Sequence, residues 1–422
     1  MTTYCYEYSI TNVEAINLAK SNHSISTGIG FFDHMLDQFN SHAQIGVAVN
    51  VLGPAEEDIN RNANVDQSEL LAKVGQHLGA SIKALLAETP VEATSRFCCP
   101  LDEALVECIL VRSQDGRLES FTLPPYGIYG KNGRTKIGQL QTLAVESFFK
   151  ALAENSGLTI ALTKIRGNNG HHIVESCFKA ISRALRNLLD GTNVDVTKGP
   201  HFDQLWGEHS DSHNQSLALQ RTAKVDRSTK ETSILLDIAL DGGAGGVTVE
   251  SGIIILDRII TALATHAGMS LTCKCKGDLY VDEHHSTEDV GIAIGQILSK
   301  AFGTKAGLNR MWCARTTAGG ATVEVTMDLS NRPCFTENLS LSQEEYVVDG
   351  QVLTTEMFHH FFESLTMNAH MTVHILQIQA GDSMEDRAMA TAAAFGKALK
   401  FCAAVDPRRG GKTASSKGTL SA

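Results

Sequence analysis

The sequence lacks any continuous apolar run of about 18 residues, the length that a helix needs to cross a bilayer. Its N-terminal stretch, MTTYCYEYSITNVEAINLAK, also lacks the charged start and apolar segment of a secretory signal peptide. The ten cysteines are scattered, without zinc-ribbon spacing, and fit a reducing compartment better than a disulfide framework. We therefore expect a cytoplasmic protein.

Basic residues are too few for a nucleic-acid scaffold. Lysine and arginine number 36 against 47 acidic residues, which gives a net charge of −11. The chain has neither a GxGxxG sequence after a strand nor the GxxxxGK[ST] phosphate loop. Its 422 residues, 43% of them hydrophobic, are enough for two or three globular domains.

What the chain does contain is a long internal repeat. Residues 27–43, TGIGFFDHMLDQFNSHA, match 250–267, and FFKALAENSGLTI at 148–160 matches FFESLTMNAHMTV at 361–373. The offset changes between these matches, and we place most of the extra residues of the first half near 76–96. The repeat predicts two domains.

Their predicted bounds are 1–200 and 221–422, with a polar, poorly periodic linker at 201–220. Alternation and composition predict strands and helices in an order unlike a doubly wound fold, so we expect an α+β protein with sheets packed on helices. Strands are predicted at 45–53, 104–111, 270–277 and 322–330, and helices at 68–86, 290–302 and 389–404.

Each half contains one His-His-x-x-Glu sequence, HHIVE at 171–175 and HHSTE at 284–288. On a helix, residues i and i+4 share a face, so the first histidine and the glutamate of each motif can hold one metal ion. The middle histidines, His172 and His285, point elsewhere and would reach the ion of a facing helix. The pattern predicts a two-metal site built by two helices.

With FFDHML around His34, the two HHxxE motifs and the C-terminal SSKGTL, each half resembles imidazoleglycerol-phosphate dehydratase of histidine biosynthesis. The resemblance implies that each domain is itself an internal duplication of a sheet-plus-helices unit. It also implies two manganese ions per site and shells of 24 domains with sites between subunits. Two domains per chain would then give 12 chains.

The two halves have lost different parts of the family pattern. The first half reads NANVDQSE where DDHHTxED belongs, which we align to put Asn64, Val65 and Ser68 at ligand positions, and it has Ser147 before Phe148-Phe149. The second half has Arg258 in place of the FLDHML histidine. It also reads GDSMEDRAM where HHxxE belongs, with Glu385, Asp386 and Met389 at ligand positions. Arg258 could supply fixed positive charge beside Glu385 or Asp386 in place of an ion.

The surviving ligands, assigned by the family pattern, form one complete centre. Two Mn²⁺ ions, or another first-row divalent metal, would each take three histidines and one carboxylate. One ion would be held by His34, His171, Glu175 and His285. The other would be held by His284, Glu288, His360 and His172.

The resemblance also implies substrate and catalytic residues. For general acid/base work we favour Glu231, with Glu103 and a metal-bound water as rivals. The candidate substrate-binding residues are Glu231, Arg310, Arg332, Ser416, Lys417, His34, His42 and Asp37. A packed structural role for His42 is an equal alternative.

The predicted function is therefore that of a hydro-lyase, which dehydrates imidazole glycerol phosphate to imidazole acetol phosphate at one composite two-metal site per two domains. Neither a nucleic-acid nor a membrane partner is expected. Two alternatives stay open. One is a pseudoenzyme that keeps the shell as a scaffold, and the other is a metal-dependent lyase acting on a related phosphorylated heterocycle.

Overall fold

The computed structural model describes residues 9–16, 24–53, 58–131, 133–191, 221–242, 245–409, 411–415 and 419–420. The chain divides into two compact units, Met1–Phe202 and Asp203–Ala422. Each unit has its own sheets and helices. The linker predicted at 201–220 lies outside the described residues.

The second unit is built of two halves with one strand order. In each half the fourth strand lies between the second and the third, antiparallel to the second and parallel to the third. The first half comprises β10 (Thr222–Ser228), β11 (Thr232–Ala239), β12 (Val247–Glu250), α7 (Ile254–Ala267), β13 (Ser270–Gly277) and α8 (His284–Phe302). The second comprises β14 (Met311–Ala318), β15 (Ala321–Asp328), β16 (Cys334–Thr336), α9 (Thr355–Asn368), β17 (Thr372–Gln379) and α10 (Met384–Ala403), with short 3-10 turns at Leu341–Gln343 and Pro407–Arg409.

The first unit repeats this arrangement. Its second half has the same strand order, with β4 (Thr94–Leu101), β5 (Ala104–Arg112), β6 (Arg117–Thr122), α3 (Ala144–Ser156), β9 (Leu158–Arg166) and α4 (Gly170–Leu189). Its first half contains β1 (Ser9–Ile16), β2 (Ile25–Ser26), α1 (Gly30–Ala43), β3 (Gly46–Leu52) and α2 (Gln67–Leu85). A two-stranded hairpin, β7 (Lys136–Ile137) with β8 (Leu140–Gln141), precedes α3.

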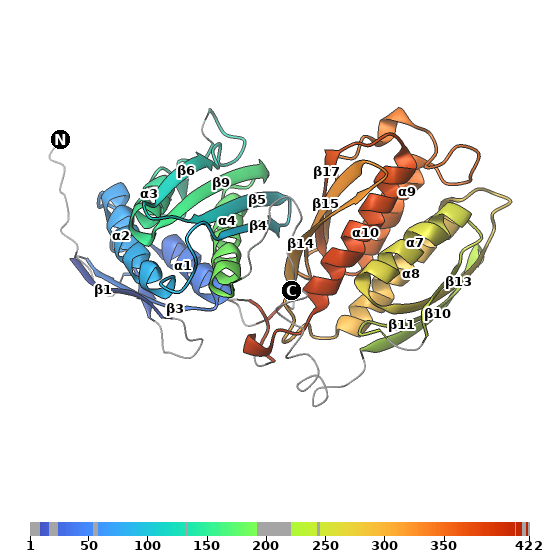
Figure 1. The fold of residues 1–422 in the computed structure, drawn as a ribbon, viewed down its shortest axis with the longest axis horizontal. Helices are drawn as coiled ribbons and strands as arrows, with labels where there is room; N and C mark the ends of the chain where they lie inside the picture. The colour runs from blue at the N-terminus through green and yellow to red at the C-terminus, as the bar shows by residue number, and fades with distance from the viewer. Residues whose placement is uncertain are drawn as a thin grey trace. The chain divides into compact units, whose positions relative to one another are not determined.

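The helices form the inner layers of each unit. In the second unit α7 and α8 cover one sheet, α9 and α10 cover the other, and α8 packs on α9 while α7 packs on α10 (Figure 1). In the first unit the corresponding helix pairs are α2 with α3 and α1 with α4. The α+β class and the predicted strands and helices are confirmed, and so is the internal duplication within each unit.

Buried phenylalanines pack between the helices of each unit. Phe148 of α3 lies against Phe32 of α1 and Phe178 of α4, with ring centroids 5.3 and 5.5 Å apart. In the second unit, Phe362 of α9 lies 5.2 Å from Phe395 of α10. Aromatic packing of this kind immobilises the helix faces beside it, so the polar side chains at the helix starts are held on rigid supports.

Glycines set the register of the helix pairs α2–α3 and α8–α9. A Cβ added at Gly79 of α2 would lie 2.6 Å from the carbonyl oxygen of Leu152 in α3. A Cβ added at Gly295 of α8 would lie 2.5 Å from the equivalent oxygen, that of Leu365 in α9. No side chain fits such an approach, so both positions require glycine. Gly79 and Gly295 are therefore equivalent positions in the two units.

That register corrects the predicted alignment of the lost motif. The residues equivalent to His284, His285 and Glu288 are Ser68, Glu69 and Ala72, on the first turns of α2. Asn64 and Val65, which we had aligned there, precede the helix. The predicted insertion near 76–96 is also wrong, because α2 and α8 have the same length of 19 residues. Most of the extra residues lie in the segment between β3 and α2, which has 14 residues (53–66), against six (278–283) between β13 and α8 in the second unit.

Candidate metal centre and active site

The first cluster of candidate ligands lies where α1 faces α4. Thr27 donates hydrogen bonds from its N–H and its hydroxyl to Asp33, at 2.6 and 2.5 Å, which fixes the first turn of α1. The next residue, His34, has its Nε2 atom 3.6 Å from Glu175 Oε2 on α4. Helix α1 thus supplies one nitrogen ligand to a site whose other ligands come from a different helix.

Helix α4 supplies the rest of this cluster. Asn169 caps the helix by accepting a hydrogen bond from the N–H of His171 at 3.0 Å. Helical spacing then brings His171 Nε2 within 2.9 Å of Glu175 Oε2. The ligand atoms of His34, His171 and Glu175 all lie within 4.8 Å of one another. Two imidazoles and a carboxylate this close form a donor set suited to a first-row divalent ion.

Glu175 is held in its ionised form. Burial alone would raise the pKa of its carboxyl group, but hydrogen bonds with His171 and His34 and the Lys179 ammonium, 2.7 Å away, outweigh burial and lower the pKa. A carboxylate ligand must be ionised, so this environment favours metal binding. Lys179 was not among the predicted site residues, although its position four residues after Glu175 on the same face was a usable signal.

The second cluster lies in the second unit, between α8 and α9. His284 Nε2 is 3.5 Å from Glu288 Oε2, and His360 Nε2 is 3.4 Å from Glu288 Oε1. The ligand atoms of these three residues also lie within 4.8 Å of one another. The described residues therefore hold one three-ligand cluster in each unit, on different helix pairs.

The middle histidines of both motifs are oriented by carboxylates. His172 Nδ1 lies 2.7 Å from Glu103 Oε2, and His285 Nδ1 lies 3.1 Å from Asp278 Oδ2. An imidazole bonded through Nδ1 has a fixed ring orientation and keeps Nε2 as the candidate metal ligand. Asp278 was missed by the sequence reasoning, and no spacing rule points to it, because it precedes His285 by seven residues across a turn.

Glu103 and Glu231 each lie in the turn between the first two strands of a four-stranded sheet, but they differ in their partners. Glu103, in the β4–β5 turn, accepts hydrogen bonds from His172 and from the N–H of Asn169 at 2.9 Å. Burial would raise the pKa of Glu103, but these hydrogen bonds lower it. Glu231, in the β10–β11 turn, has a 51% exposed side chain with Oε1 3.7 Å from His285 Nε2. Glu231 is thus the more accessible carboxylate.

Two further predicted residues share α1 with His34. Asp37 lies one turn on, and burial raises the pKa of its carboxyl group, partly opposed by the nearby His34. His42 is buried, with 1% of its surface exposed, in the last turn of the helix. That burial favours the packed role for His42, and its role as a substrate contact stays a prediction.

Arg310 is engaged inside the second unit. Its Nε and Nη2 atoms donate to the two oxygens of Asp328 at 2.7 and 2.9 Å, and its Nη1 donates to the carbonyl oxygen of Ala414 at 2.5 Å. The guanidinium therefore anchors the segment that leads to the predicted Ser416 and Lys417, which lie outside the described residues. Arg332 lies in the β15–β16 connection, where its carbonyl oxygen accepts from Ser330 and Thr372.

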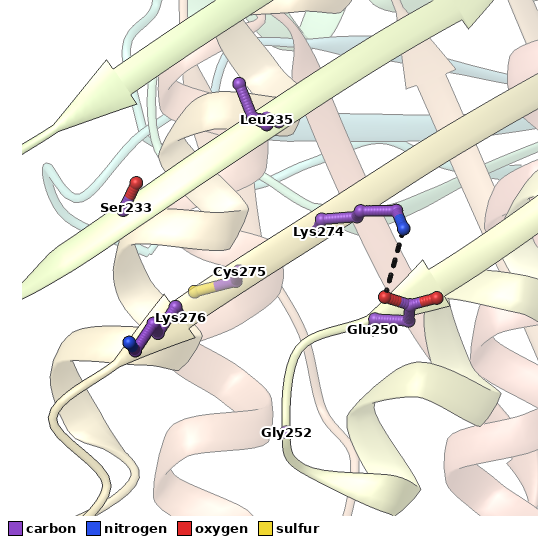
Figure 2. A pocket seen from close by; sticks show the side chains of 7 residues that line it. All are labelled: Ser233, Leu235, Glu250, Gly252, Lys274, Cys275 and Lys276. Atoms are coloured by element: carbon purple, nitrogen blue, oxygen red, sulfur yellow. Dashed lines mark ion pairs between the residues drawn. The ribbon is translucent and has the colours of Figure 1, made fainter.

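The second unit also has a surface hollow, and none of the residues of either cluster lines it. It has a volume of about 450 Å³ and is lined by Ser233, Leu235, Glu250, Gly252, Lys274, Cys275 and Lys276 (Figure 2). Figure 2 shows the lining side chains on β11, β12 and β13, with Gly252 in the loop after β12. Lys274 Nζ is paired with Glu250 at 3.3 Å. None of the predicted site residues lines it, and its mixed polar and apolar lining carries no recognisable chemistry.

Comparison with known proteins matches both units to one family. The family model for imidazoleglycerol-phosphate dehydratase matches residues 27–185 and 251–399. Imidazoleglycerol-phosphate dehydratase 1, chloroplastic, of Arabidopsis thaliana is 39% identical over 212 residues, which are 50% of this chain and 76% of that protein. The imidazoleglycerol-phosphate dehydratase of Gluconobacter oxydans is 38% identical over 200 residues, 47% of this chain and 98% of its own.

Among solved structures, imidazoleglycerol-phosphate dehydratase from Staphylococcus aureus subsp. aureus N315 matches with a TM-score of 0.38 and 28% identity, over 44% of this chain and 98% of that chain. No described helix of the present chain is long and apolar enough to cross a membrane.

Two repeated α+β units, each with a histidine–carboxylate cluster, define a duplicated lyase fold. The chain belongs to the imidazoleglycerol-phosphate dehydratase family, and it carries two diverged copies of the family domain in tandem. It is accordingly a hydro-lyase of histidine biosynthesis.

Proposed function

We propose that the chain dehydrates imidazole glycerol phosphate to imidazole acetol phosphate at a composite two-metal centre, with one half contributed by each kind of unit. The observation that carries this proposal is that the two units keep different three-ligand clusters, one on α1–α4 and the other on α8–α9. Neither unit keeps both among its described residues. A complete two-ion site therefore requires a first unit and a second unit together.

Each ion would gain its fourth ligand from the opposite unit. His285 would join His34, His171 and Glu175, and His172 would join His284, Glu288 and His360. The orientation of His172 by Glu103 and of His285 by Asp278 supports this, because both rings are held through Nδ1. Three imidazoles and one carboxylate per ion suit Mn²⁺ or a similar first-row metal and leave positions for substrate.

Divalent ions at these ligands would supply positive charge beside the substrate imidazole and so favour its deprotonated form. The protein's part is to move a proton and release a hydroxyl. A carboxylate removes the proton from the middle carbon of the side chain, and the hydroxyl on the carbon next to the ring leaves with a proton as water. The resulting enol becomes a ketone by moving one proton from oxygen to carbon, so the atoms balance.

Glu231 is the proposed proton carrier and Glu103 a positioning residue. Glu231 is half exposed and lies beside His285, so it stands at the edge of the cluster where a substrate carbon would come. Both oxygens of Glu103 already accept hydrogen bonds, from His172 and the start of α4. A carboxylate with those partners is better suited to orienting a histidine than to exchanging protons.

The phosphate of the substrate would be held by Arg332, Ser416 and Lys417, with Arg310 fixing the segment before Ser416. Forked guanidinium and point-charge ammonium groups are the usual partners of a phosphate. We also propose that the chain assembles with itself, as a shell of 12 chains if the 24-domain arrangement of the family is kept, and that it works in the cytoplasm.

The proposal is tested by measuring Mn²⁺-dependent formation of imidazole acetol phosphate by the purified chain. His285→Ala should lose turnover. The matched control is Glu69→Ala, at the equivalent position of α2, where turnover should be retained. A folded, metal-loaded assembly that leaves the substrate unchanged would contradict the proposal and favour a scaffold or a different phosphorylated heterocycle.

A further inference from the structure

Helices α7 and α10 of the second unit correspond to α1 and α4 of the first. Ser251 donates hydrogen bonds from its N–H and hydroxyl to Asp257, at 2.8 and 2.5 Å, just as Thr27 does to Asp33. The helix start is therefore preserved in both units. The residue that follows the aspartate is His34 in the first unit and Arg258 in the second.

An ion pair occupies this place in the second unit. Arg258 Nη2 lies 2.5 Å from Glu385 Oε1, and it joins α7 to α10. Glu385 is the second residue of α10, as His171 is of α4, and Met389 stands where Glu175 stands. The first-unit cluster of two imidazoles and a carboxylate has thus become a guanidinium, a carboxylate and a thioether.

These residues do not fit a divalent ion. A guanidinium stays protonated and has no lone pair to offer, and its positive charge repels a cation. The Met389 thioether is a soft ligand, poorly matched to manganese. Glu385 is left as the single hard ligand of the three, and it is already paired with Arg258.

We infer that the Arg258–Glu385 pair is a fixed-charge replacement for a metal ion, which ties α7 to α10 without binding metal. The inference rests on the proposed function, because it takes the α1–α4 cluster as a metal half-site. It divides the four corresponding helix pairs into two kinds. The pairs α1–α4 and α8–α9 bind metal, whereas α2–α3 and α7–α10 do not, so the chain carries two ions rather than four.

Metal content of the intact protein tests the stoichiometry. The chain is loaded with Mn²⁺, freed of excess metal and measured by elemental analysis, with two ions per chain expected. The double variant H34A/H284A should fall to background. Metal that persists in this variant and disappears on adding Glu385→Gln would overturn the inference, because it would place an ion at α7–α10.

Rebuilding the half-site is the converse test. The triple variant R258H/E385H/M389E recreates the ligand set of α1–α4 and should bind about one further Mn²⁺ per chain. Arg258→Lys in the parent keeps the charge and should bind no Mn²⁺ beyond the two ions of the parent. If the triple variant unfolds, the metal content of Arg258→Met decides: a content unchanged from the parent supports the inference, whereas a lower content contradicts it.

Hydrogen exchange separates the two kinds of helix pair directly. In the variant His360→Ala, which lacks the α8–α9 half-site, a chelator should speed amide exchange in α1 and α4 and leave α7 and α10 unchanged. Equal acceleration in α7 and α10 would overturn the inference. If α1 and α4 do not respond and no metal is found, the proposed function fails instead, and the two failures are thus distinguished.

Discussion

The two units share one fold but not one set of ligands, and the difference shows which positions the fold itself requires. The buried phenylalanines and the close-approach glycines recur in both units. The ligands differ, and they are partly exposed: the side chain of His34 is 33% exposed and that of His284 is 48% exposed. Because such side chains contribute little buried apolar area, a unit can lose them and still fold.

The largest difference between the units is expected in the effect of a substitution near the start of α3 or α9 on kcat/KM. His360→Ala should remove a ligand from the α8–α9 cluster and lower kcat/KM by more than about 100-fold, since loss of a metal ligand disables the ion that it holds. Ser147→Ala, the same position in the first unit, should change it by less than about twofold. Steady-state kinetics with bound Mn²⁺ measured in parallel checks both, and comparable losses would mean that the first unit also carries a site there.

Substitution of Glu231 and of Glu103 should affect different properties, kcat in one case and Mn²⁺ binding in the other. Glu231→Gln should reduce kcat by about 10²- to 10⁴-fold with metal content unchanged, as expected for a general acid/base. Glu103→Gln should instead weaken Mn²⁺ binding by about 10- to 100-fold, because His172 loses its orienting partner. A Mn²⁺ titration distinguishes them, since excess metal rescues Glu103→Gln alone. Rescue of Glu231→Gln by metal would reverse the two roles.

Substitution of Arg310 should lower the stability of the second unit only. Arg310→Ala leaves the buried Asp328 without its partner, so it should destabilise the second unit by about 3–5 kcal/mol. Thermal or urea unfolding followed by hydrogen exchange would show the loss in the second unit. The matched control is Arg117→Ala, an exposed pair with Glu119 in the first unit, which should cost at most about 1 kcal/mol.

The smallest expected effect comes from adding one methyl group at equivalent glycines of the two units. Gly79→Ala and Gly295→Ala each force a helix pair apart and should cost about 1–3 kcal/mol. Only Gly295→Ala moves α8 from α9, so it alone should lower the affinity for Mn²⁺. Isothermal titration with Mn²⁺ compares the two variants, and equal loss of affinity would argue that the metal sites respond to general destabilisation.

The sequence predicted the elements that carry repeated patterns, and it failed where a pattern had been erased. Helical spacing in HHIVE and HHSTE correctly placed both motifs on helices. The lost motif was misaligned because its ligands, the usual markers, were gone. The register is instead set by the contact of Gly79 with α3, which cannot be seen in the sequence.

Side-chain partners across the fold were also beyond sequence reasoning. The contact of Arg310 with substrate stays a prediction, whereas its pairing with Asp328 depends on how two strands meet and could not be inferred from residue type. Asp278 became visible only when the turn before α8 brought it to His285. Residue type indicated the possible chemistry of each side chain, and the packing decided its neighbour.

The division of ligands between the two units also means that neither unit alone can return to a single-domain form with both ligand clusters by one substitution. A second unit regains the α1–α4 ligand set only if Arg258, Glu385 and Met389 all change, and each single change leaves an incomplete set. Deletion of either half, in turn, would remove one of the two retained clusters. Because both halves are translated as one polypeptide, they are made in equal numbers, and neither can be overproduced without the other.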